Sequence, residues 1–137
     1  DIGDGMKVLA ECGNLFVDFC ANTNQHVFEA LIDAVGPARI LFGSDMPILR
    51  MRSHRITEHG RYINCVPKGL YGDVSADPNM REVTGAEADG ITFFMYEEID
   101  AFRLAAESRR LGEADIRRVF HDNAAELIDG VRHSSCL

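Results

Sequence analysis

Apolar positions in the first third of the chain predict a strand, a helix and a second strand. Residues 15–20 and 39–44 are short, nearly continuous apolar runs, the pattern of strands covered on both faces of a parallel sheet. Between them, residues 28–35 carry apolar side chains at helical spacing, with N-cap candidates at 22–24 and a Gly-Pro stop at 36–37. Such a unit is typical of an α/β barrel or a doubly wound sheet.

The pattern is less regular after the second strand. We expect a helix over 48–59, then a long connection over 60–90 that is rich in Gly, Pro, Asn and Asp. A connection of that length is usually functional or mobile. Helical spacing returns over 93–111 and again over 116–128, with a kink expected near 121–123.

Charge and composition narrow the classes of partner. The net charge of −8 argues against nucleic acid and acidic membranes. No apolar run approaches the roughly 20 residues that span a bilayer. The four cysteines contain no Cys-x-x-Cys pair and no signal peptide is present, so we expect a cytoplasmic protein. The first residue is Asp rather than Met, and we expect the chain to begin within a larger protein.

The most informative chemical feature is a carboxylate at the end of a predicted strand. Residues 39–47 read RILFGSDMP, in which a buried strand leads to Asp45 and Pro47 ends the strand. Ligands of parallel α/β folds meet the carboxyl ends of the strands, and Gly43 leaves space beside the backbone there. By spacing alone, a strand-end Asp is more often a turn or cap residue, so the structural interpretation leads at this point.

This motif resembles strand eight of the amidohydrolase-related metal-dependent hydrolases, a family of barrel proteins. Residues 14–19, NLFVDF, resemble the family's strand seven, and residues 123–128, NAAELI, resemble its C-terminal helix. The resemblance implies the C-terminal part of a (β/α)₈ TIM barrel. Residues 1–47 would be its last two strand–helix units, 48–90 an insertion loop after strand eight, and 91–137 the C-terminal helices.

By this resemblance, Asp45 binds a divalent metal, with zinc expected, and takes a proton from the activated water. The family places its other ligands on a His-x-His pair in strand one and on histidines in strands five and six, which this chain lacks. The five histidines here follow no predicted strand, so we transfer no ligand role to them. A catalytic zinc needs about three protein ligands, so we expect these 137 residues to be inactive alone.

Three further residues are candidates for substrate binding. Asp18 lies in a strand predicted to be buried, where it would contact substrate, or equally bond a neighbouring backbone group or arginine. Arg50 and Arg52 would bind a substrate carboxylate, although a solvated helix face explains them as well. Residues 68–73 would form a lid or an oligomer contact, and the sequence does not choose between them.

The resemblance implies hydrolysis of a C–O or C–N bond in a small-molecule substrate. A nonoxidative decarboxylase of the same superfamily is the nearest alternative, because it would use Asp45 in the same place. An alternative from a different functional class is a non-enzymatic interaction module. Its exposed strand edges would pair with another chain or within a homo-oligomer.

Overall fold

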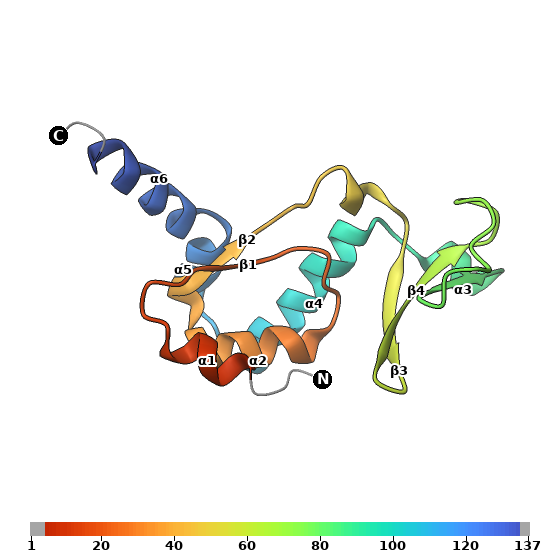
Figure 1. Ribbon diagram of the computed structural model, residues 1–137, viewed down its shortest axis with the longest axis horizontal. Coiled ribbons are helices and arrows are strands. Elements are labelled where there is room, and N and C mark those ends of the chain that lie inside the picture. The colour runs from red at the N-terminus through yellow and green to blue at the C-terminus, as the bar shows by residue number, and fades with distance from the viewer. Residues whose placement is uncertain (1–4, 135–137) are drawn as a thin grey trace. The chain divides into compact units, whose positions relative to one another are not determined.

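The computed structural model describes residues 5–134, which form two compact units (Figure 1). Of these residues, 5–20, 26–43 and 104–134 form what we call the strand–helix unit. Residues 21–25 and 44–103 form what we call the insertion unit. The insertion unit therefore contains the segments that begin two residues after each of the first two strands.

The strand–helix unit is built on two parallel strands, β1 (Val17–Phe19) and β2 (Ile40–Phe42), which lie side by side in Figure 1. Helix α2 (Gln25–Val35) joins them and buries its predicted apolar face, Phe28, Leu31, Ile32 and Val35. A short helix, α1 (Gly5–Glu11), precedes β1, and a 3₁₀ turn, η1 (Pro37–Arg39), precedes β2. The predicted strand–helix–strand unit is confirmed.

Aromatic rings hold this unit together. The Phe19 ring lies edge-on to Phe28 at a centroid distance of 4.9 Å and to Phe42 at 5.8 Å. Phe42 in turn stacks on Phe120 at 4.9 Å. Because Phe120 comes from the C-terminal region, these contacts join the last third of the chain to the first.

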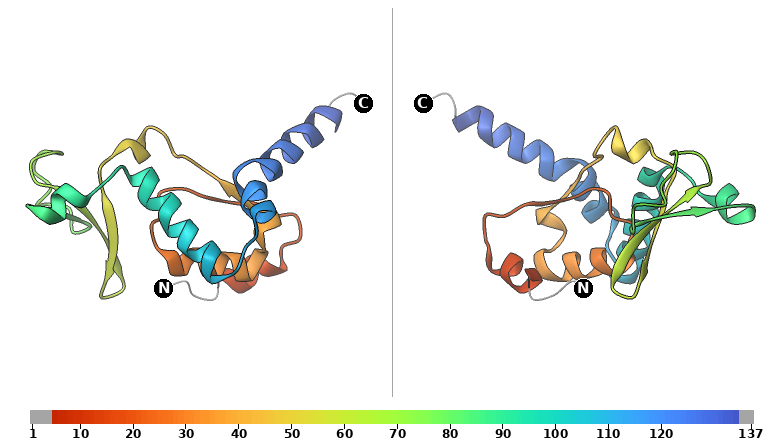
Figure 2. Two further views of the ribbon diagram at one scale, coloured as in Figure 1. Left: turned by 180° about the vertical axis from the view of Figure 1, so that it is seen from behind. Right: turned by 45° about the vertical axis from the view of Figure 1, so that its right-hand side comes forward.

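The C-terminal region consists of α4 (Phe94–Ser108), α5 (Glu113–Arg117), a π-helical turn η3 (Arg118–Asp122) and α6 (Asn123–Ser134). The π turn confirms the predicted kink, and α6 continues from it (Figure 2). A π turn inserts one extra residue into the helical hydrogen-bond pattern and so redirects the faces of the helix that follows.

The helix expected over 48–59 was wrong. Only a 3₁₀ turn, η2 (Ile48–Arg50), forms, and β3 (His54–Glu58) pairs antiparallel with β4 (Arg61–Pro67). The two residues between these strands, His59 and Gly60, have φ of 50° and 76°. Two consecutive positive φ values make the tight hairpin turn that matches the twist of antiparallel strands. This turn favours the hairpin over the helix that the weak apolar spacing of residues 48–59 predicted.

The prediction of one long connection over 60–90 was also wrong, because regular secondary structure forms at both ends of this range. Strand β5 (Met80–Val83) pairs parallel with β4, and helix α3 (Ala86–Gly90) follows it. The resulting three-stranded sheet and α3 are visible in the right view of Figure 2. Its small core contains Cys65, Val83 and Ile91, with Ile56, Ile63 and Ala88 packed against them.

Candidate functional site

Asp45 lies three residues beyond the end of β2, in a turn that exposes its carboxylate. Its φ is 40°, a left-handed conformation that aspartate tolerates better than most residues. The Asp45 carbonyl accepts hydrogen bonds from the amides of Ile48 (2.9 Å) and Leu49 (3.4 Å), and the Leu49 side chain is fully buried. The turn is therefore anchored, while the carboxylate accepts no hydrogen bond from any described residue.

Asp18 was predicted to lie in a strand covered on both faces, and that prediction was wrong. Its neighbour Phe19 is buried, but Asp18 is exposed, so β1 is covered on one face in the described residues. Its Oδ2 lies 3.3 Å from the point where a Cβ on Gly43 would stand. The missing side chain at Gly43 therefore makes room for the Asp18 carboxylate, next to the carboxyl ends of both strands.

The two candidate arginines differ in their surroundings. Arg50 ends η2 and is exposed. The guanidinium of Arg52 donates hydrogen bonds to the Ile91 carbonyl (2.9 and 3.1 Å) and the Ala88 carbonyl (3.1 Å). These bonds fix the end of α3 and give Arg52 a structural role. Of the two arginines, only Arg50 has an exposed side chain.

Arg55 organises the insertion unit, a role that the sequence did not predict. Its guanidinium lies over the rings of Tyr62 (4.7 Å) and Phe94 (4.9 Å) and donates to Asn64 Oδ1 (2.8 Å) and the Ala21 carbonyl. Burial lowers the pKa of Arg55. The group nevertheless stays charged, because an arginine keeps its proton throughout the physiological range.

The bonds around Arg55 hold the loop that follows β1. The hydroxyl of Thr23 donates to the Arg55 carbonyl (3.2 Å), and the Asn22 amide donates to Oε1 of the buried Glu98 (3.4 Å). Residues 21–25 are thus tied to the sheet of the insertion unit.

The histidines do not gather at one site. His54 begins β3 and bonds Glu97, His26 bonds Glu29, and His121 bonds Asp122, each through Nδ1. His59 directly follows β3, which corrects the expectation that no histidine follows a strand. Across residues 5–134, no group of three or more His, Cys, Asp or Glu side chains could hold a metal ion.

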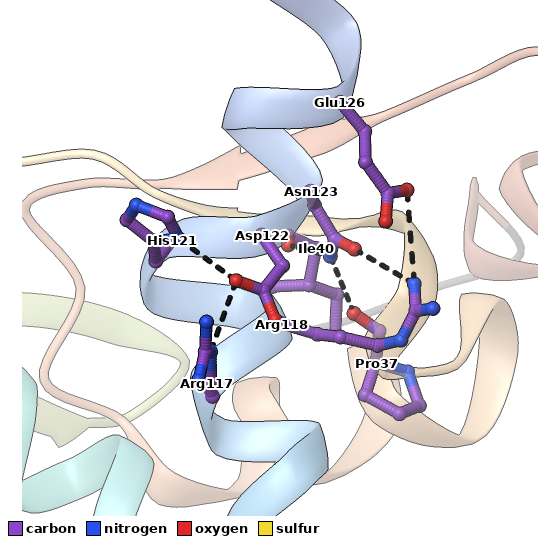
Figure 3. A network of polar contacts seen from close by, with 8 residues as sticks. All are labelled: Pro37, Ile40, Arg117, Arg118, His121, Asp122, Asn123 and Glu126. Atoms are coloured by element: carbon purple, nitrogen blue, oxygen red, sulfur yellow. Dashed lines mark hydrogen bonds and ion pairs between the residues drawn. The ribbon is translucent and has the colours of Figure 1, made fainter.

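The sequence His121-Asp122-Asn123 forms a structural network around the π turn (Figure 3). The Asp122 carboxylate accepts from His121 (2.8 Å) and Arg117 (3.1 Å), and both bonds lower the pKa of Asp122. Asn123 is buried within the helical run, where its Nδ2 donates to the carbonyls of Pro37 and Ile40, each at 2.8 Å.

The two parallel strands β1 and β2 make this an α/β arrangement, the type of fold in which ligands meet the carboxyl ends of the strands. Residues 2–65 match the family model described as amidohydrolase. The match covers both predicted strands and Asp45, and it confirms the resemblance seen in the sequence. It leaves residues 123–128 untested.

No curated protein and no solved structure matched the chain. The matched family is one of hydrolase-type enzymes, many of which use a divalent metal. Within the described residues, no helix is long and apolar enough to cross a membrane.

Proposed function

We propose that this chain contributes the last two strand–helix units of a (β/α)₈ barrel to a metal-dependent hydrolase. The observation that carries the proposal is Asp45, an exposed carboxylate that accepts no hydrogen bond from residues 5–134 and lies in an anchored turn just beyond a parallel strand. Its position within the family match adds support. The expected reaction is the hydrolysis of a C–O or C–N bond in a small molecule.

The described residues do not form a metal site on their own, since they supply Asp45 and no cluster of three donors. A catalytic zinc takes about three protein ligands, so the remaining ligands must come from polypeptide outside the described residues. The metal, with zinc expected, would supply positive charge that lowers the pKa of a water to about 7. Asp45 would orient the attacking water and accept its proton.

The sheet of the strand–helix unit supports an assembly larger than the described residues. It contains two strands, β1 and β2, so each has one edge without a partner strand in residues 5–134. Unpaired edges of parallel strands are normally covered by further strands. We propose that other barrel strands occupy these edges, in the same polypeptide or in a partner copy.

Asp18 and Arg50 are the proposed substrate contacts. The Asp18 carboxylate occupies the space left by Gly43 and would accept a hydrogen bond from a substrate donor. Arg50 would bind a substrate carboxylate, whereas Arg52 would need to release the Ala88 and Ile91 carbonyls first. We propose a cytoplasmic location, and Cys12 and Cys65 form no disulfide among the described residues.

The test compares the full-length gene product with its Asp45→Asn variant. Zinc per polypeptide is measured by elemental analysis, hydrolysis is followed with a panel of lactones and amides, and decarboxylation is followed with aromatic acids. We expect the variant to lose most of its zinc and its activity, while an Asp129→Asn control on exposed α6 keeps both. Equal zinc content and equal rates in Asp45→Asn and the wild type would overturn the assignment.

A further inference from the structure

The segment between β4 and β5 is loosely packed. We call residues 70–78 the β4–β5 loop, and none of them is buried. An open cavity of about 540 Å³ lies against this loop, and its lining includes Tyr71, Val74, Pro78 and Met80. Because the loop borders a cavity rather than a hydrophobic core, little apolar burial holds it in place. Segments of this kind open more readily than the rest of a structure.

The hydrogen bonds of the β4–β5 loop are local, with one exception. The Ser75 amide, for example, donates to Asp73 Oδ1 at 3.0 Å. Within the part of the chain that the structure describes, one hydrogen bond joins the loop to a residue outside 67–80. In it, the Arg52 amide donates to the Tyr71 hydroxyl oxygen at 2.6 Å. This bond therefore ties the loop to the segment that leads into β3.

Two glycines lie on either side of Tyr71. Gly69 and Gly72 both have a φ of 75°, a conformation that glycine adopts at little cost. A Cβ at either position would meet nothing within 4 Å, so the backbone conformation, and not a lack of space, favours glycine there. The Gly69 amide donates to Glu82 Oε1 at 2.7 Å, which fixes the base of the loop. The loop thus has a fixed base and a conformationally free residue on each side of its one distant contact.

We propose that the β4–β5 loop is a lid that moves about Gly69 and Gly72 and is held closed by the hydrogen bond from Arg52 to Tyr71. The sequence left two roles open for residues 68–73, and these contacts favour the lid over the oligomer contact. Opening would release the Arg52 amide, two residues after Arg50, and would loosen the segment that carries the Arg50 side chain. The substrate contact of Arg50 rests on the proposed function, whereas the movement of the lid does not.

Tyr71→Phe tests the lid, because it keeps the aromatic ring and removes the acceptor of the Arg52 amide. The measurement is amide hydrogen exchange and ¹⁵N relaxation of the intact protein by NMR. We expect the Arg52 amide to exchange about tenfold faster, and the order parameters across 70–78 to fall below about 0.6. The amides of Asn64 and Lys68, which bond the carbonyls of Asn79 and Val83, should keep their exchange rates.

Tyr96→Phe is the matched control, because it removes an exposed hydroxyl that bonds no described residue, and it should leave the Arg52 amide unchanged. An unchanged exchange rate of Arg52 in Tyr71→Phe would overturn the proposal. Equal acceleration at Asn64 and Lys68 would also overturn it, since the whole sheet would then have been destabilised. The measurement needs neither metal nor substrate, so its result is independent of the hydrolase assignment.

Gly72→Ala tests the movement without touching the hydroxyl. Alanine disfavours the positive φ of the closed loop, so we expect the Arg52 amide to exchange about fivefold faster although Tyr71 is present. Gly13→Ala, at a position without a positive φ, should leave that rate constant. The wild-type exchange rate of Arg52 in Gly72→Ala would refute the role of this glycine in opening the lid.

Discussion

The side-chain amide of Asn123 donates a hydrogen bond of 2.8 Å to the backbone carbonyl of Ile40, 83 residues earlier in the chain. A second bond of the same length reaches the Pro37 carbonyl. Asn123 is 1% exposed and Ile40 is also 1% exposed, so water does not compete for these groups. One amide thus joins the start of α6 to the entry of β2 (Figure 3).

Asn123→Ala is expected to lower the free energy of unfolding by about 2 kcal/mol, because it removes two hydrogen bonds and takes the side-chain donor from the buried Ile40 carbonyl, while the Pro37 carbonyl keeps the bond from the Ile40 amide. Urea unfolding followed by circular dichroism measures the loss. Glu126→Gln, one turn later and exposed, should change stability by less than about 0.5 kcal/mol. Equal unfolding midpoints for Asn123→Ala and the wild type would show that the amide contributes nothing.

Gly43→Ala is expected to displace the Asp18 carboxylate. The new methyl group would meet Asp18 Oδ2 at 3.3 Å and both Cys20 Cβ and the Phe19 carbonyl at 3.4 Å, so a neighbour must move. The cost should be about 1 kcal/mol, and the ¹³C shift of the Asp18 carboxyl should change. In Gly13→Ala, where a Cβ has nothing within 4 Å, that shift should stay constant.

Arg55→Lys should loosen the loop after β1. A lysine keeps the charge but has no planar fork to lie over Tyr62 and Phe94 while it bonds Asn64 and Ala21. We expect faster amide hydrogen exchange across residues 21–25 and a loss of about 1–2 kcal/mol. The same exchange in Arg55→Lys as in the exposed control Arg61→Lys would contradict this role.

Glu97 should make the free energy of unfolding depend on pH in the acidic range. Its pKa in the folded state lies below the ordinary value of 4.5. This stability is therefore present above pH 4.5 and is lost as the pH falls through the lower folded-state pKa. Denaturant unfolding between pH 6 and 3 would show a weaker pH dependence in Glu97→Gln. An identical pH profile in the variant would exclude the carboxylate as its source.

The sequence predicted the strand–helix unit well, because its pattern is local. The apolar spacing along α2 and the two short apolar strands each lie within a dozen residues. The insertion unit was mispredicted because its strands depend on distant partners. In β3, Ile56 packs against a core that includes Val83 and Ile91, and β5 pairs with β4 from across a loop.

In the candidate site, too, local features were predicted from the sequence and features that depend on distant contacts were missed. Asp45 was found because strand and carboxylate are adjacent in the sequence, and the family match covers both. The exposure of Asp18 was missed because an apolar strand does not reveal how many of its faces are covered. The role of Arg55 was missed because its partners, Ala21 and Phe94, are 34 and 39 residues away in the chain.

The tie between Arg55 and Ala21 has a consequence for exchanging parts between related proteins. The loop after β1 and the segment after β2 belong to one compact unit, although α2 and β2 separate them in the sequence. A chimera that transplants residues 44–103 alone would pair Arg55 with a foreign loop that lacks Thr23, whose hydroxyl holds the loop to the Arg55 carbonyl. Residues 21–25 and 44–103 therefore form a two-part cassette, to be inherited or engineered together.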